Sequence, residues 1–310
     1  MANGKKIGVL GTGPVGQTIA DRLAGLGHSV FVSTRDPKET MARTWNDNFG
    51  NPPFKVWREA HPQIGFGTLA QAAAHGEIVV NATTGTASLA ALEEAGHANL
   101  AGKVLVDISN PLDFSRGMPP SLTVCNTDSL GEQIQKAFPD VRVVKTLNTM
   151  SCYLMVGPAQ LAGGNHTVFV SGDDAGAKQT VRELLRSFGW EDIVDLGDIT
   201  TARGTEMMLP IWARVFVATG NPMFSFKLVR QPVYMIGASE LLIIVLTLGL
   251  LGLQIFSIVH IATGDFDSSD KKILWLLVVI FVGVIGPILY LLIGRQSRFK
   301  AGETVMPKQR

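Results

Sequence analysis

Short apolar runs alternate with stretches whose apolar residues recur at helical spacing over the first 230 residues of the chain. Strands are expected at residues 7–10, 29–33, 64–66, 78–83, 104–108, 141–147, 167–171 and 193–196, and helices at 15–26, 88–96, 129–138, 175–188 and 200–219. Strands that are apolar throughout and alternate with helices are typical of a parallel sheet covered on both faces. The pattern therefore predicts an α/β, doubly wound, mainly parallel sheet with a small helical extension, forming a domain over residues 1–230.

The first strand leads directly into the turn Gly11-Thr12-Gly13-Pro14-Val15-Gly16. In this context Gly11 makes the tight turn, Gly13 lets the backbone approach a pyrophosphate, and Gly16 lets helix and strand pack closely. Thr12 and Val15 complete the turn, whose free amides and helix dipole attract an anion. The unit predicts a dinucleotide-binding site of Rossmann type.

The end of the second strand indicates which dinucleotide binds. Sites for NAD usually carry an acidic residue there, about twenty residues after the glycines, to hold the ribose 2′-hydroxyl. This chain has Ser33, Thr34 and Arg35 instead, followed by Lys38. Hydroxyl and guanidinium groups match the oxygens of a 2′-phosphate. Asp36 is interpreted as the cap of the next helix. The sequence therefore predicts NADP in preference to NAD.

Polar residues also follow the other expected strands. Thr83 and Thr84 end one strand, Asn110 follows the next, and Asn148 and Thr149 follow a third. Ligands of open α/β sheets bind outside the carboxyl ends of the strands. Thr83, Thr84 and Asn110 are therefore candidates for contacting ribose or nicotinamide, with a purely structural capping role left open.

Several spaced motifs together resemble the coenzyme F420-dependent NADP oxidoreductase family over about residues 5–230. The motifs are Gly11 to Gly16, Ser33-Thr34-Arg35, Val144-Lys145-Thr146-Leu147-Asn148-Thr149, Ser171-Gly172-Asp173-Asp174 and Ala202-Arg203-Gly204-Thr205-Glu206. The resemblance implies an enzyme that transfers hydride directly between NADP(H) and F420, an 8-hydroxy-5-deazaflavin. It also implies that Asn148, Thr149 and Arg203 border the acceptor pocket, and that the protein forms a homodimer. The same domain family includes the cytosolic domain of membrane metalloreductases.

Other chemistry is not indicated. Arg203 and Glu206 either face the acceptor or form a structural i, i+3 ion pair. No Ser/His/Asp or Cys/His arrangement and no metal-ligand spacing is recognisable, and Cys125 and Cys152 are interpreted as reduced thiols. The net charge of +1 gives no reason to expect nucleic acid as a partner.

The positive mean hydropathy of +0.24 comes from the last part of the chain. Residues 241–261 and 273–294 are uncharged apart from His260 and almost entirely apolar. Each is long enough to cross a hydrocarbon core of about 30 Å as a helix. Glu240 and His260 lie close to the expected interfaces, where ionisable groups are tolerated. The sequence predicts a two-helix transmembrane hairpin over residues 233–300.

Charged residues outside the two spans suggest the orientation. Lys227 and Arg230 precede the first span, and Arg295, Arg298 and Lys300 follow the second. The positive-inside rule then predicts a multi-pass protein of the cell membrane with its catalytic domain and both termini in the cytoplasm. The hairpin also resembles the N-terminal module of phospholipase D-like enzymes, through residues Trp275, Pro287, Tyr290, Gly294 and Arg295. Because no His-x-Lys signature accompanies it, the hairpin is interpreted as an anchor in the lipid bilayer.

These features together predict a membrane-anchored, NADP-dependent oxidoreductase with a deazaflavin or similar flavin-like acceptor. Two alternatives remain: a non-catalytic protein that senses NADPH, and a component of a metalloreductase. The acceptor, the direction of hydride transfer and the oligomeric state are not determined by the sequence.

Overall fold

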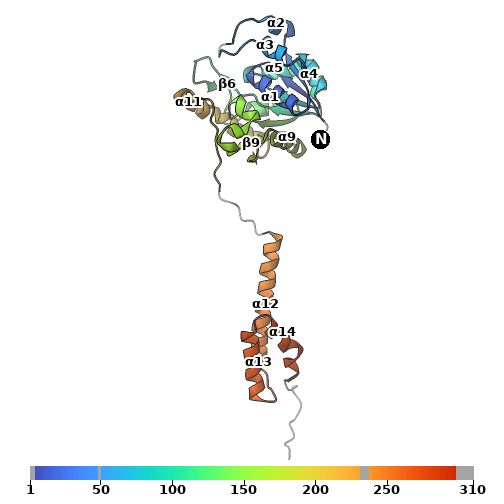
Figure 1. Cartoon of the computed structure of the whole chain (residues 1–310), viewed down its shortest axis with the longest axis vertical. Coiled ribbons are helices and arrows are strands. Elements are labelled where there is room, and N and C mark those ends of the chain that lie inside the picture. Colours follow the sequence, from blue (N-terminus) through green and yellow to red (C-terminus); the bar gives the residue numbers. More distant parts are fainter. Residues whose placement is uncertain (1–3, 48–49, 231–236, 298–310) are drawn as a thin grey trace, which may run out of the picture. The chain divides into compact units, whose positions relative to one another are not determined.

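The computed structural model describes residues 4–47, 50–230 and 237–297, and it divides into two compact units. The first unit reaches Val229 and the second begins at Arg230 (Figure 1).

The first unit is built on an eight-stranded sheet in the order β10-β9-β8-β5-β4-β1-β2-β3. Its strands are β1 Lys6–Leu10, β2 Ser29–Thr34, β3 Gly65–Thr68, β4 Ile78–Asn81, β5 Val104–Asp107, β8 Arg142–Thr146, β9 Val168–Ser171 and β10 Ile193–Asp195. All neighbouring strands are parallel except β8 and β9, which pair antiparallel. The prediction of a mainly parallel, Rossmann-type sheet is therefore confirmed.

Helices cover both faces of this sheet. They are α1 Pro14–Gly25, α2 Pro37–Ala42, α3 Phe54–Ala60, α4 Leu69–His75, α5 Gly85–Ala95, α6 His97–Leu100, α7 Leu130–Ala137, α8 Cys152–Val156, α9 Ala175–Phe188, α10 Ala202–Met207 and α11 Leu209–Thr219. One core packs α1, α8 and α9 against the sheet, and a second packs α4, α5 and α7 against the other face. The side chains of β1 alternate accordingly, since Ile7 and Val9 belong to the first core and Leu10 to the second.

The structure corrects three local expectations. Residues 54–60 form a helix, α3, that is not among the helices expected from the sequence. The helix expected over residues 200–219 is divided at Met208 into α10 and α11, because Pro210 has no amide and cannot continue a helix. A short hairpin that was not predicted, β6 Leu112–Asp113 with β7 Ser121–Leu122, follows β5.

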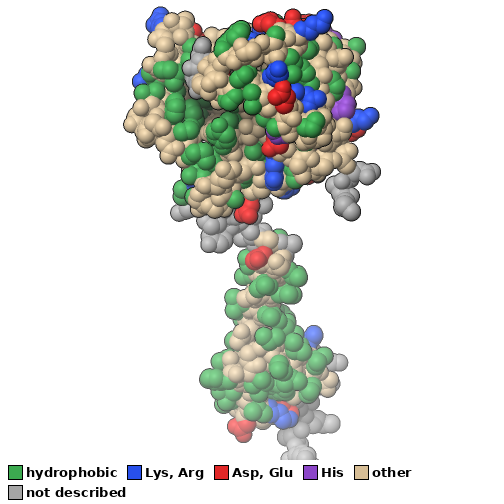
Figure 2. Space-filling view, turned by 45° about the horizontal axis from the view of Figure 1, so that its top comes forward, with side chains coloured by type: hydrophobic (Ala, Val, Ile, Leu, Met, Phe, Trp, Pro, Cys, Tyr) green, Lys and Arg blue, Asp and Glu red, His purple; other side chains and the backbone are tan. Residues whose placement is uncertain are grey.

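The second unit consists of α12 Ala238–Ala262, α13 Ser269–Phe281, α14 Ile285–Leu292 and the short helix η4 Gly294–Ser297. Apolar side chains dominate its visible surface (Figure 2). Of the helices in the described residues, one is long and apolar enough to cross a membrane, spanning Ser239–Ala262 with a mean hydropathy of 2.6 and with 6% of its most apolar window buried.

The single second helix expected over residues 273–294 is absent, because the chain divides it between α13 and α14. Gly283 stands at the break with a φ of +55°, a backbone conformation that glycine adopts readily. Pro287 explains the position of the break. Its ring excludes the helical hydrogen bond to residue 283, whereas the first turn of a new helix accommodates it.

The packing of α4 against β1 yields a first prediction. A Cβ at Gly8 would lie 2.2 Å from the Ala72 carbonyl oxygen, so the helix backbone would have to move away. We expect Gly8→Ala to lower the free energy of unfolding by about 1–3 kcal/mol, as overpacking does. The matched control is Gly204→Ala in α10, where an added Cβ would meet nothing within 4 Å. It should be neutral or stabilising, since alanine favours a helix. Urea unfolding of the full chain in detergent checks both; equal losses would contradict this account.

Candidate functional site

The order in which the chain adds strands to the sheet reverses between β1 and β4. The chain goes from β1 to β2 and β3 on one side and later crosses to β4 on the other side of β1. Such a switch point leaves a crevice at the carboxyl ends of the two strands. The structure has an open cleft of about 310 Å³ there. The lining residues are Gly11, Thr12, Gly13, Thr34, Arg35, Thr40, Arg43, Leu69, Ala82, Thr83, Thr84, Ala87 and Ala91. The cleft thus joins the glycine turn to the ends of β2 and β4.

The three glycines of the turn differ in what surrounds them. Gly11 has a φ of +118°, and its amide donates to the Ser33 carbonyl at 2.9 Å. A Cβ at Gly16 would lie 2.2 Å from the Gly11 carbonyl oxygen, so this glycine permits the close contact of helix and turn. A Cβ at Gly13 would meet nothing within 4 Å, and Gly13 is the N-cap of α1. Gly13 therefore leaves room for a ligand beside the first helical turn, where Val15 and Gly16 supply amides without intrahelical acceptors.

The end of β2 presents hydroxyl and guanidinium groups to the cleft. The hydroxyls of Thr34 and Thr40 lie 3.0 Å apart, and Arg35 and Arg43 line the same space. Arg43 also lies 5.9 Å from the ring of Trp45, within the range of a cation–π contact. The position of Arg43 was not foreseen. A basic residue just beyond α2 is a weak signal until the helix is known to turn it toward the cleft.

Three expectations for this region have different outcomes. Asp36 accepts hydrogen bonds from the amides of Lys38 and Glu39, which confirms its interpretation as a helix cap. The Ser33 side chain is fully buried and donates to the Val9 carbonyl, so its hydroxyl does not face the cleft. Lys38 lies exposed on the first turn of α2, outside the residues that line the cleft.

Thr83 lies at the end of β4 within a polar cluster. Its hydroxyl is 2.6 Å from Asn81 Oδ1 and 2.8 Å from Ser88 Oγ. Asn81 is fully buried and also donates to Asp107. Thr83 therefore both lines the cleft and connects it to the polar interior of the sheet.

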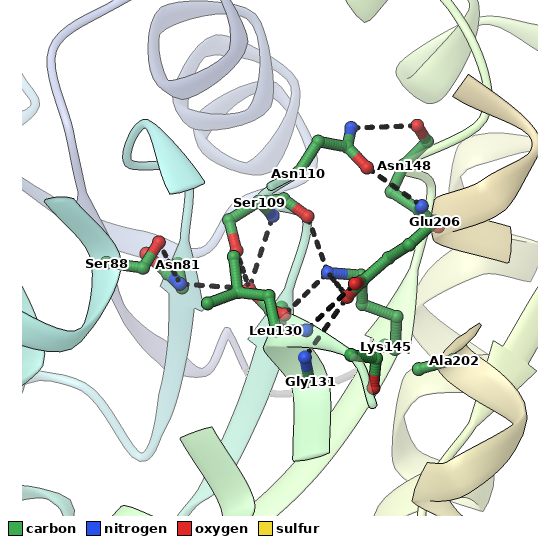
Figure 3. Close-up of polar contacts among 12 residues, drawn as sticks. Asn81, Ser88, Ser109, Asn110, Leu130, Gly131, Lys145, Asn148, Ala202 and Glu206 are labelled. Carbon is green, nitrogen blue, oxygen red and sulfur yellow. Dashed lines mark hydrogen bonds and ion pairs between the residues drawn. The ribbon is translucent and has the colours of Figure 1, made fainter. Parts of the chain in front are cut away.

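Asn110 and Asn148 form a reciprocal pair across the ends of β5 and β8. Asn110 Nδ2 donates to the Asn148 carbonyl at 2.9 Å, and Asn148 Nδ2 donates to Asn110 Oδ1 at 3.0 Å (Figure 3). Leu147, just before Asn148, has a φ of +60°, which is uncommon for a residue with a side chain. Thr149 follows and is 4% exposed. The structure thus brings Asn110, Asn148 and Thr149 together, as the strand-end argument predicts.

A buried ion cluster lies directly beneath this pair. Lys145 Nζ is 2.8 Å from Asp107 Oδ2, 2.8 Å from Glu206 Oε1 and 2.5 Å from the Ser109 carbonyl (Figure 3). All three charged side chains are at most 1% exposed. Asp107 also accepts from the amide and hydroxyl of Ser109. The cluster was not recognised in the sequence, although charged residues at the ends of apolar strands are a signal for it.

The charges of this cluster support one another. Burial by itself lowers the pKa of the Lys145 ammonium, but attraction to Asp107 and Glu206 outweighs that effect and raises it. Lys145 therefore remains charged at neutral pH. Glu206 also accepts hydrogen bonds from the first two amides of α7, those of Leu130 and Gly131, at 2.8 and 3.1 Å. The amino end of a helix stabilises a carboxylate, so Glu206 ties α10 to both the sheet and α7.

Arg203 points to a different partner. Its Nε donates to Glu132 Oε2 at 2.8 Å, and its NH2 group pairs with Glu132 Oε1. These hydrogen bonds raise the pKa of Arg203. Arg203 and Glu206 therefore do not form the i, i+3 ion pair considered from the sequence, and in this structure Arg203 is engaged by α7.

The fold and the cleft define a dinucleotide-binding oxidoreductase domain of Rossmann type. Residues 6–111 match the family described as NADP oxidoreductase, coenzyme F420-dependent. A protein of Arthrobacter sp. FB24, named as an F420-dependent NADP-reductase in its crystal structure, is 58% identical with a TM-score of 0.70. The match covers 73% of this chain and 100% of that one. The chain belongs to this family, and its cofactor is NADP.

Three further comparisons extend the picture. Metalloreductase STEAP3 of Rattus norvegicus is 32% identical over 212 residues, which cover 67% of this chain and 38% of the relative. Metalloreductase STEAP2 of Homo sapiens is 25% identical, covering 70% and 37%. The chain thus spans less than two fifths of the length of these relatives. Residues 252–295 match the N-terminal module of phospholipase D nucleases.

The buried cluster gives a second prediction. Lys145→Met would leave two carboxylates unpaired in the interior, which typically costs about 3–5 kcal/mol of stability. The control is Lys55→Met, because Lys55 forms an exposed pair with Glu59 at 3.8 Å, and such pairs contribute at most about 1 kcal/mol. We expect a large loss in the first variant and almost none in the second, measured by urea unfolding of the full chain. Similar stabilities would show that the cluster does not hold the fold together.

Proposed function

We propose that this protein is a membrane-anchored enzyme that transfers hydride between NADP(H) and a deazaflavin such as F420, or a similar acceptor. The observation that carries the proposal is the cleft at the switch point. It combines a glycine turn open at Gly13 with Arg35 at the end of β2 and Arg43 just beyond α2. The Asn110–Asn148 pair lies at the ends of the next strands of the sheet, β5 and β8, outside the residues that line the cleft.

The cofactor would lie along this cleft. Its pyrophosphate would accept from the amides around Gly13, Val15 and Gly16. The 2′-phosphate would lie between Arg35 and Arg43, since guanidinium groups form paired hydrogen bonds with phosphate oxygens. Thr34 is close enough to the same space to donate its hydroxyl. This assignment adds Arg43 to the residues expected from the sequence. Lys38 and Ser33, which do not line the cleft, would contribute less to binding the 2′-phosphate.

The nicotinamide end would lie near Asn110, Asn148 and Thr149. Direct hydride transfer requires no acid, base or metal, so the protein's task is to hold the two rings in contact. The carboxamides of Asn110 and Asn148 hold each other and so present a fixed polar edge. Arg203 would have to leave Glu132 to reach an acceptor there.

The second unit would anchor the enzyme. At 1.5 Å per residue, the 25-residue helix α12 is about 37 Å long. This length exceeds the hydrocarbon thickness of about 30 Å. Most of the exposed side chains of α12 are apolar, among them Leu242, Ile243 and Leu248 at 58–62% exposure. We place the catalytic unit in the cytoplasm, where NADPH is supplied. The expected second span depends on residues 273–294, which α13 and α14 share.

A second candidate function is that of a metalloreductase component, with a metal ion as the final electron acceptor. The similarity to metalloreductases STEAP3 and STEAP2 favours it. A homodimer, as the resemblance implies, is compatible with either function.

The 2′-phosphate assignment leads to a third prediction. Arg35→Ala and Arg43→Ala should each weaken NADPH binding about 10- to 100-fold, the value of one or two hydrogen bonds to a charged group. Binding of NADH should change little. Arg116→Ala, an exposed arginine in the β6–β7 connection, is the control. Titration of intrinsic fluorescence with each nucleotide checks this; an equal loss for NADH and NADPH would remove both arginines from the 2′-phosphate site.

Turnover provides the test of the function itself. Anaerobic oxidation of NADPH by detergent-solubilised protein is followed at 340 nm with oxidised F420, with FMN and with a ferric chelate as parallel acceptors. We expect rapid oxidation with the deazaflavin alone. Turnover with the ferric chelate alone would favour the metalloreductase. Tight NADPH binding without turnover on any acceptor would overturn the proposal and favour an NADPH sensor.

A further inference from the structure

The helices of the second unit differ in length. At 1.5 Å per residue, the 13 residues of α13 extend about 20 Å and the eight residues of α14 about 12 Å. Neither length crosses a hydrocarbon core of about 30 Å. If α12 spans the membrane, then α13 and α14 must either continue one another or fold back.

The contacts between α13 and α14 show that they fold back. A Cβ at Gly286, at the start of α14, would lie 2.2 Å from the carbonyl oxygen of Val278, near the end of α13. A Cβ at Gly294, just beyond α14, would lie 2.6 Å from the ring of Trp275, at the middle of α13. Contacts between late residues of one helix and early residues of the next require an antiparallel pair. The two glycines let these helices approach closely.

Contacts with α12 give the depth of this pair. Lys272 Nζ donates to the carbonyls of Ala262 and Gly264 at 2.8 and 3.1 Å, where α12 ends. Gln254 Nε2 donates to the Val279 carbonyl at 3.2 Å, and Gln254 lies about 12 Å along α12 from Ala262. The turn after Phe281 therefore lies near the middle of α12.

The return of α14 has an independent marker. His260 Nδ1 and the Tyr290 hydroxyl are 2.6 Å apart, and Tyr290 is fully buried. His260 belongs to the last turn of α12, so Tyr290 has returned to that end. Arg295, in η4, directly follows Gly294, which packs against the Trp275 ring at the middle of α13.

The surface of the α13–α14 pair is that of a lipid-facing segment. Residues 273–294 contain no charged side chain. Around the turn, Phe281 is 79% exposed and Ile285 is 60% exposed. Charged residues lie at the opposite end of the pair, where Lys271 pairs with Asp267. Apolar helices of about 10–14 residues are more often re-entrant or buried than membrane-spanning, and an apolar tip with a charged base fits a segment that enters a bilayer and leaves it on the same side.

We propose that α13 and α14 form a re-entrant hairpin that occupies only the bilayer leaflet farther from the catalytic unit. The chain then crosses the membrane once, through α12, and residue 297 lies on the face opposite the NADP-binding unit. This inference rests on the proposed membrane anchoring. It replaces the arrangement expected from the sequence, in which two spans return the C-terminus to the cytoplasm. The positive-inside rule favours the two-span arrangement, so the side on which residue 297 lies discriminates between them.

The test uses single-cysteine versions of the full chain. Cys152→Ser leaves the exposed Cys125 as a reporter of the catalytic unit. In a background that also carries Cys125→Ser, Asp265→Cys reports the α12–α13 loop and Ser297→Cys reports the end of η4. A membrane-impermeant maleimide is applied to right-side-out and to inverted membrane vesicles from a bacterial host. NADPH binding by each variant, measured after solubilisation, verifies that it has folded.

We expect Cys125 to be labelled only in inverted vesicles, and the cysteines at 265 and 297 only in right-side-out vesicles. Labelling of position 297 in inverted vesicles, with 265 still labelled in right-side-out vesicles, would overturn the hairpin and establish two spans. Labelling of all three positions in inverted vesicles would show that α12 does not cross, and would overturn the membrane span as well. Neither outcome bears on NADPH turnover, which tests the catalytic proposal separately.

Discussion

The ion cluster around Lys145 is the interaction on which the catalytic unit depends. One ammonium, buried at the end of β8, is shared by Asp107 of β5, Glu206 of α10 and the Ser109 carbonyl. Burying three charges is costly in isolation, and it is tolerable here because the hydrogen bonds among them and to the α7 amides are numerous. The cluster therefore joins strands and helices that are far apart in the sequence, and the loops that carry Asn110 and Asn148 follow its two strands, β5 and β8.

This arrangement suits the proposed hydride transfer, which requires no acid, base or metal ligand from the protein. Hydride transfer between two ring systems depends on their distance and orientation. Ser109 is held by Asp107 and Lys145, and its neighbour Asn110 is held by Asn148. The positive φ of Leu147 turns the chain so that Asn148 can make this contact. The polar edge beside the proposed nicotinamide site is thus prearranged by the interior of the protein.

The second unit differs from the first in that its surface is mostly apolar. Some of its few polar side chains join helices, as in the contacts Gln254–Val279 and His260–Tyr290. Backbone and side-chain polar groups at membrane depth need partners within the protein. The two contacts meet that need while holding α13 and α14 against α12. In this unit, hydrogen bonds specify how apolar helices pack.

The sequence by itself determined the strands, the glycine turn, the NADP preference and the apolar character of the last segment. These depend on local properties: apolar periodicity, glycine at a tight turn, and the residue types that follow one strand. Only the tertiary structure revealed Arg43 at the cleft, the engagement of Arg203 by Glu132, and the Lys145 cluster, because each pairs residues separated by tens of positions or by an intervening helix. The second apolar segment shows the same limit. Its length predicted a span, whereas Gly283 and Pro287 allow a break, and the contacts of Gly286 and Gly294 decide that the chain folds back.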